Sequence, residues 1–190
     1  MRNWIPFVAC ALGGLLLGTG FAAWSVHQGS LGATVSIGPW RTGADFGSAE
    51  ASSYTRAVVA WRGLLAAPAR EVRYYTAADD DSGRPLDGHC RYRVSGGDVG
   101  GSWWSLALYD SLGYLVANPY GLYSVESAAM SAMERAHWSL LAAPERQPGR
   151  WLPTGSVPRF ELTLRIYQPS DGGAGNLPLQ HLPRIERLGC

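Results

Sequence analysis

Residues 102–110 read SWWSLALYD, and residues 160–168 read FELTLRIYQ. In an extended strand successive side chains point to opposite faces of a sheet. Each stretch therefore predicts a strand with one apolar face and one mixed face. The apolar faces consist of Trp104, Leu106 and Leu108 in the first stretch and of Phe160, Leu162, Leu164 and Ile166 in the second. Strands of this kind indicate an antiparallel sheet that buries one face in a core.

Further alternating stretches extend this pattern along the chain. Residues 71–76 (EVRYYT) and 89–94 (HCRYRV) predict a hairpin with a long polar connection, and residues 137–142 (HWSLLA) predict another strand. Short strands separated by glycine-rich and proline-rich turns indicate a mainly β fold, an antiparallel β-sandwich or barrel. One amphipathic helix is expected at 51–66, where apolar residues recur every three or four positions.

The N-terminal segment predicts a membrane-spanning helix. Residues 3–28 contain no Asp, Glu, Lys or Arg, and at about 1.5 Å per residue such a helix crosses the roughly 30 Å hydrocarbon core of a bilayer. Arg2 favours a cytoplasmic N-terminus and a periplasmic domain. We therefore expect residues 4–26 to cross the bacterial inner membrane once, with Trp4 and Trp24 near its two interfaces.

A cleaved signal peptide is the alternative for the same segment. Small residues at Gly20, Ala22 and Ala23 suit a signal peptidase, and the product would then be secreted to the periplasm. Gly14 and Gly18 form a GxxxG pattern, which mediates packing between membrane helices and would make the chain a homo-oligomer.

The size and charge of the chain limit its function. A length of 190 residues suits one domain of ordinary size. We assign residues 1–28 to the anchor or signal segment, 29–47 to a connector and 48–190 to the β-sandwich domain. The net charge of +1 argues against a nucleic-acid partner, which selects a basic surface.

The cysteines allow a disulfide in the exported domain. Cys10 lies in the apolar segment, which leaves Cys90 and Cys190 as a pair. An oxidising compartment lets such a bridge form and persist. Two unrelated thiols are the alternative, because the geometry of a disulfide is strict.

Standard catalytic and metal-binding motifs are missing. The sequence contains no HExxH, CxxC, GxSxG or P-loop, and its four histidines lack the spacing of metal ligands. The acidic run at 79–81, with Asp87, lacks EF-hand spacing and fits a solvated loop better than a calcium site. We predict no metal and no cofactor. Asp110 and Asp87 are the carboxylates to inspect for a glycan-active enzyme, which needs two of them facing each other across a sugar.

A candidate binding face follows if HCRYRV and SWWSLALYD pair as antiparallel neighbours. Arg91 and Arg93 would then lie beside Trp103 and Tyr109 on the face opposite the core. Arginine beside exposed aromatic rings stacks on sugars and is common at the centres of protein interfaces.

Alternatively, the predicted helix would cover this face of the sheet. An amphipathic helix must bury its apolar stripe against another element. Under this alternative Trp61 and Leu65 would cover the sheet, and Trp103 would be buried beneath them.

Eight stretches occur in one order along the chain: SIGPW, YTRAVVAWRGLLA, EVRYYTAADDDSGRPLDGHCRYRV, WWSLALYD, GYLVANP, RWLPTG, FELTLRIYQP and LPRIERL. Together they resemble the bacterial family catalogued as domain of unknown function 1214. The resemblance implies a jelly-roll-like β-sandwich, here in a short membrane-anchored form without the companion domain of unknown function 1254. It implies no established activity and no catalytic residues.

We therefore expect a noncatalytic, membrane-anchored periplasmic module. It would bind or assemble with an envelope glycan or a protein partner. The alternative is a glycan-active enzyme with carboxylates in a cleft.

Overall fold

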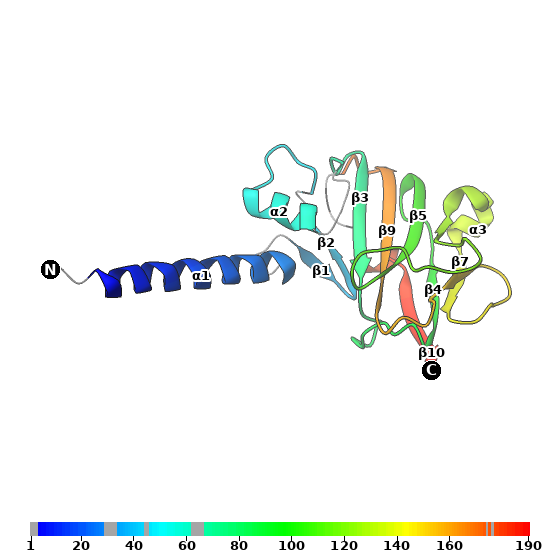
Figure 1. Ribbon diagram of the computed structural model, residues 1–190. Coiled ribbons are helices and arrows are strands. Elements are labelled where there is room, and N and C mark those ends of the chain that lie inside the picture. The colour runs from blue at the N-terminus through cyan, green and yellow to red at the C-terminus, as the bar shows by residue number, and fades with distance from the viewer. Residues whose placement is uncertain (1–3, 29–33, 44–45, 62–66, 174, 176) are drawn as a thin grey trace.

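The computed structural model describes residues 4–28, 34–43, 46–61, 67–173, 175 and 177–190 (Figure 1). Arg2 and Leu65 lie outside these ranges. The helices are α1 (Ile5–Gln28), α2 (Ser53–Trp61) and α3 (Ala132–Ala136), with short 3-10 helices η1 (Ser127–Ala129) and η2 (Leu179–His181). The strands are β1 (Val35–Ile37), β2 (Trp40–Thr42), β3 (Val72–Ala77), β4 (Arg91–Gly96), β5 (Gly101–Asp110), β6 (Ser124–Glu126), β7 (Trp138–Ala143), β8 (Trp151–Pro153), β9 (Phe160–Pro169) and β10 (Arg184–Gly189).

In the described part of the chain the strands form two sheets. One has the order β1-β2-β3-β9-β5-β6, and the other has the order β10-β4-β7-β8. Neighbours are antiparallel except for the parallel pair β7 and β8. The expected mainly β fold, preceded by an apolar helix, is confirmed. Residues 35–42 of the expected connector belong to it, since β1 and β2 extend the six-stranded sheet.

Two predicted strand pairs are wrong, because the links between those strands cross from one sheet to the other. β4 pairs with β10 and β7, whereas β5 pairs with β9 and β6. The glycine-rich link between β4 and β5 buries Val99 in the core, and the link between β3 and β4 buries Leu86 there. An apolar side chain inside each link thus carries the chain across the sandwich instead of turning it back as a hairpin.

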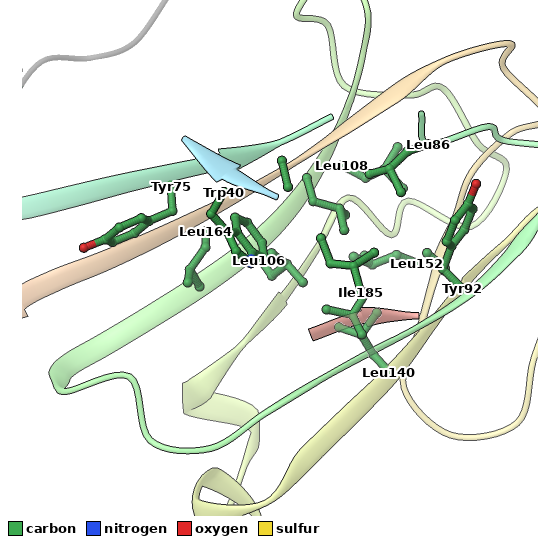
Figure 2. Close-up of a cluster of buried hydrophobic side chains, with 14 of the residues drawn as sticks. Trp40, Tyr75, Leu86, Tyr92, Leu106, Leu108, Leu140, Leu152, Leu164 and Ile185 are labelled. Atoms are coloured by element: carbon green, nitrogen blue, oxygen red, sulfur yellow. The ribbon is translucent and has the colours of Figure 1, made fainter. Parts of the chain in front are cut away.

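Side chains from both sheets meet in one apolar core. Figure 2 shows part of it, with Trp40, Tyr75, Leu86, Tyr92, Leu106, Leu108, Leu140, Leu152, Leu164 and Ile185 labelled. Trp104 is 2% exposed, and its ring centroid lies 4.6 Å from that of Trp138 in the opposite sheet. The indole N–H of Trp40 donates a 2.7 Å hydrogen bond to the carbonyl of Pro183. This bond joins β2 of one sheet to the segment that leads into β10 of the other.

In the part of the chain that the structure describes, the N-terminal helix projects away from the sandwich, and its C-terminal end contacts α2 (Figure 1). Residues 6–27 are long and apolar enough to cross a bilayer, and within them Ser25, next to the contact with α2, is buried. Signal sequences share this length and apolar character. Gly14 and Gly18 have open space around them, and the homo-oligomer expected from them stays a prediction.

α2 packs beside the end of α1. Val58 and Val59 form a second apolar cluster with Phe46, and Val26 of α1 packs against it. Trp61 is 64% exposed, so its ring does not cover a sheet face.

Candidate functional site

Strands β5 and β9 lie side by side in the middle of the six-stranded sheet. Their register pairs Trp103 with Tyr167, Ser105 with Arg165 and Tyr109 with Glu161. The residues between these positions point into the core, so all six side chains lie on the outer face of the sheet. Trp104 is core and Trp103 is half-exposed, as the alternation in 102–110 predicts.

Four of these side chains form an ordered surface, which we call the arginine–aromatic strip: Trp103, Tyr109, Arg165 and Tyr167. The rings of Trp103 and Tyr167 have centroids 4.7 Å apart. The guanidinium of Arg165 donates a 2.6 Å hydrogen bond to the hydroxyl of Tyr109 and lies 5.3 Å from the centre of its ring. All four side chains are half-exposed.

The gap between Trp103 and Tyr109 is filled from the neighbouring strand. Ser105 and Ala107, the small residues between them, are 6% and 4% exposed. Arg165 starts opposite Ser105 and reaches the hydroxyl of Tyr109, so its side chain passes over these small residues. Arg165 therefore occupies the space between the two aromatic rings, which is not an open slot.

Tyr74 of β3 borders the strip beside Arg165. Burial raises the pKa of the Tyr74 hydroxyl, the neighbouring Tyr167 adds to the rise, and the Arg165 charge opposes it. The hydroxyl therefore stays neutral near neutral pH, and the positive charge of the strip comes from Arg165.

The loop after β5 continues the strip with exposed apolar side chains. These are Leu112, Tyr114, Leu115, Tyr120, Leu122 and Tyr123, from 38% to 79% exposed. We call residues 111–123 the apolar loop. It folds back on β5, because the backbone N–H of Asp110 donates to the carbonyl of Tyr114 and a bridge pairs Tyr109 with Leu115.

Two side chains hold the apolar loop in shape. Oδ1 of Asp110 accepts hydrogen bonds from the backbone N–H groups of Leu112 and Tyr114, each 2.9 Å long. Asn118 accepts from the N–H groups of Tyr120 and Leu122, and its amide donates to the carbonyls of Val116 and Leu122. Asp110, expected as a catalytic candidate, is thus a turn-forming residue that orders exposed apolar side chains.

Asp87, the other catalytic candidate, also closes a turn. Its Oδ1 accepts from the backbone N–H of His89 and lies 2.8 Å from the Nδ1 atom of that ring. The hydrogen bonds from the His89 backbone and side chain hold the pKa of Asp87 below its usual value. A general acid in glycoside hydrolysis needs a raised pKa, so the surroundings of Asp87 oppose that role.

The acidic run before Asp87 is tied into the fold by basic side chains rather than left solvated. The pairs are Asp79 with Arg41, Asp80 with Arg84 and Arg187, and Asp81 with Arg184. In the described part of the chain, no group of three His, Cys, Asp or Glu side chains is placed to hold a metal ion.

Asp80 is the buried centre of this network, with 1% exposure. Its Oδ2 lies 3.2 Å from Nε of Arg187, an ion pair that lacks hydrogen-bond alignment. Burial opposes the charge of Asp80, but N–H bonds from Arg84 and Ser82 and the charges of Arg84 and Arg187 outweigh it and lower the pKa. The run thereby fastens β10 to the loop after β3.

Cys190, directly after the C-terminal end of β10, forms a disulfide. The structure joins Cys90 to Cys190 across a sequence separation of 100 residues, and Cys10 is a free, exposed thiol.

Arg91 and Arg93 do not join the strip. They lie on the outer face of the four-stranded sheet, where both are exposed and Arg93 forms a 3.0 Å ion pair with Glu186 of β10. Arg165 takes the place expected for them. Its position was readable from the sequence, because the alternation in 160–168 puts Arg165 and Tyr167 on the outer face.

One pocket lies beside the strip. It is lined by Thr42, Gly43, Phe46, Ala69, Val72, Arg73 and Tyr74. These described lining residues include no carboxylate, and only Tyr74 connects the pocket to Arg165. It is therefore not the deep cleft with two facing carboxylates that a glycosidase requires.

Comparison with known proteins agrees with this fold. A crystal structure of the VPA0106 protein from Vibrio parahaemolyticus is similar with a TM-score of 0.58 and 20% identity, covering 73% of this chain and 36% of that one. An uncharacterised protein from Burkholderia cenocepacia has a TM-score of 0.47 and 13% identity, covering 62% and 30%.

This chain thus spans about a third of the length of each of these two proteins, and at 20% identity the likeness to the Vibrio protein concerns the fold alone. No curated protein matches the sequence. Residues 71–171, from the start of β3 to the end of β9, match the model of a protein family of unknown function. They make up more than half of the 190 residues, and the chain belongs to that family, DUF1214.

Proposed function

We propose that this chain is a noncatalytic binding module, anchored in the bacterial inner membrane by α1, with its β-sandwich in the periplasm. Its partner is an envelope protein. The binding surface is the arginine–aromatic strip together with the apolar loop. The observation that carries the proposal is that this loop exposes several large apolar side chains in a fixed shape beside the strip.

The composition of the surface favours a protein partner. Monomeric proteins rarely expose contiguous apolar patches without an interaction to cover them. Tryptophan, tyrosine and arginine are also the residues that contribute most to binding at protein interfaces. Trp103, Tyr109 and Arg165 supply all three types on two neighbouring strands, where Trp103 contacts Tyr167 and Arg165 contacts Tyr109.

The shape of the surface supports the same choice over a small ligand. Sites for small molecules are concave, with a few convergent polar groups. The strip has no open slot between its rings, because Arg165 fills the space above Ser105 and Ala107. A rigid surface loses little conformational entropy when a protein of matching shape covers it.

Photocrosslinking in intact cells tests the proposal. A photoreactive amino acid is placed at Leu112, which is 79% exposed in the apolar loop, or at Met133, which is 84% exposed on α3. We expect position 112 to form an adduct with one envelope protein that mass spectrometry identifies, and position 133 to form none with it. Trp103→Ala combined with Tyr114→Ala should weaken binding of that purified protein at least tenfold.

Two outcomes contradict the proposal. Equal crosslinking to the same protein from both positions would show contact without a defined surface. Adducts at position 112 that contain only glycan, and that vanish on glycan digestion, would assign the surface to an envelope polysaccharide instead.

A further inference from the structure

The C-terminal end of α1 is held against α2 by specific contacts. The hydroxyl of Tyr54 donates a 2.6 Å hydrogen bond to the carbonyl of Ser25. The indole N–H of Trp61 donates a 2.9 Å bond to Nδ1 of His27. Val26 packs against the second apolar cluster between these two bonds. α2 therefore has a fixed place beside the last turn of α1, as Figure 1 shows.

With α1 as the proposed membrane anchor, its length determines the depth at which the contact between α1 and α2 lies in the bilayer. Trp4 and Trp24 are 20 residues apart. This separation is about 30 Å along a helix, which matches the thickness of the hydrocarbon core. Both rings are exposed, and tryptophan prefers the membrane–water interface. Ser25 and His27 then lie just beyond the hydrocarbon, in the headgroup layer. Because α2 bonds to both, it lies in that layer too.

Aromatic rings continue from α1 onto α2 at this level. Phe21 and Trp24 are three residues apart, lie on one face of α1 and have ring centroids 5.9 Å apart. His27 follows three residues later, and its ring meets Trp61 edge-on at 5.7 Å. Trp61 thus extends the row of rings beyond α1, with most of its surface uncovered by protein. A tryptophan in this position suits the boundary between headgroups and acyl chains.

The exposed face of α2 has the chemistry of a lipid contact. Arg56, Ala57, Ala60 and Trp61 are exposed, and the helix contains no acidic residue. An arginine near the bilayer attracts anionic headgroups, and the two alanines allow close approach. We propose that this face of α2 binds the phospholipid headgroups of the periplasmic leaflet and fixes the orientation of the sandwich on the membrane. This inference rests on the proposed anchoring by α1.

Spin labelling of the full chain tests it in liposomes of phosphatidylethanolamine and phosphatidylglycerol. The native Cys10 carries a label that reports on α1. Ala60→Cys and Glu145→Cys, each combined with Cys10→Ala, report on α2 and on the loop after β7. Figure 1 shows that loop on the side of the sandwich away from α1. Power saturation then measures the accessibility of each label to oxygen and to a water-soluble nickel chelate.

We expect nickel accessibility at position 60 to be several-fold lower than at position 145, with oxygen accessibility between those of positions 10 and 145. Equal nickel accessibility at 60 and 145, with position 10 in hydrocarbon, refutes the lipid contact and leaves the anchor intact. A label at position 10 as nickel-accessible as that at 145 refutes the anchor itself.

A pair of variants tests the role of the tryptophan. Trp61→Ala removes the ring and its bond to His27, so nickel accessibility at position 60 should rise. Met133→Ala is the control, since Met133 is 84% exposed on α3 and lies outside the proposed binding surface, and it should leave position 60 unchanged. An equal response to both substitutions would also refute the proposed contact.

Discussion

Replacing Trp104 and Trp103 one at a time separates the two faces of β5. Trp104 is 2% exposed, and its ring lies 4.6 Å from that of Trp138 across the core. Truncation of such a ring to alanine costs about 3–5 kcal/mol, because the surrounding core cannot collapse into the space. At about 2–4 °C per kcal/mol for a chain of this size, Trp104→Ala should lower the melting temperature by roughly 6–20 °C.

Trp103→Ala should cost far less. Its ring is half-exposed and pairs with Tyr167 on the outer face of the sheet. An aromatic pair contributes about 0.5–1.5 kcal/mol beyond the area it buries. We therefore expect a loss of about 1–2 kcal/mol and a fall of roughly 2–8 °C in melting temperature.

Thermal unfolding of the full chain in detergent micelles, followed by circular dichroism, measures both effects. Trp104→Phe is the control, since it retains an aromatic ring in the core and should recover much of the stability lost in Trp104→Ala. Equal, severe destabilisation by Trp103→Ala and Trp104→Ala would refute the outer-face position of Trp103. It would also remove that residue from the proposed binding surface.

Further predictions concern thiols and carboxylates. Maleimide should label only Cys10 in the denatured, unreduced chain, and it should also label Cys90 and Cys190 after reduction. Three reactive thiols before reduction would exclude the disulfide. Asp80→Asn should destabilise the fold by about 3–5 kcal/mol at neutral pH, because it leaves arginine charges uncompensated. The folded pKa of Asp80 is lowered, so its stabilisation exists above the ordinary value of 3.8 and fades as pH falls through the folded value; a pH-independent difference in urea midpoint would contradict this. The Glu134 carboxylate accepts hydrogen bonds from the Arg150 guanidinium and from the backbone N–H and hydroxyl of Ser131, and these bonds lower the pKa of Glu134 to about 2; Arg150→Gln should therefore move its NMR titration toward 4.5, and an unchanged titration would refute the pairing.

Alternation of residue types predicted the faces of the long strands correctly. In β5 and β9 an apolar side chain at every second position identifies the core, and Trp104, Leu106, Leu162 and Leu164 are all buried. The same alternation carries no information about which strand is the neighbour. Pairing depends on where the links run, and the link that buries Val99 runs from β4 in one sheet to β5 in the other.

The alternation of residue types could not predict the short strands or the side-chain contacts between strands. β1, β2, β6 and β8 have three residues each, too few for a period of two to be recognised. The mixed face of 102–110 predicted Trp103 and Tyr109 as binding residues, whereas Arg165 and Tyr167 on the mixed face of 160–168 were not among the predicted ones. The contact of Arg165 with Tyr109 depends on strand register, because the two positions are not directly opposite each other. The apolar residues in 111–123 are plain in the sequence, but their exposure was not predicted, and their fixed shape depends on hydrogen bonds to the side chains of Asp110 and Asn118.

The pairing of β10 with β4 sets an order in which this protein can be completed during synthesis. Ile185 lies beside Val94 in the sheet, although the ribosome adds it 91 residues later (185 − 94). Until then β4 has one open hydrogen-bonding edge, and the indole N–H of Trp40 lacks the Pro183 carbonyl that accepts its hydrogen bond. A nascent chain that stalls after β9 therefore presents an unpaired strand edge and an incompletely covered core. Such an edge recruits strands from other chains, so quality control has a distinct target in any product that ends before residue 183.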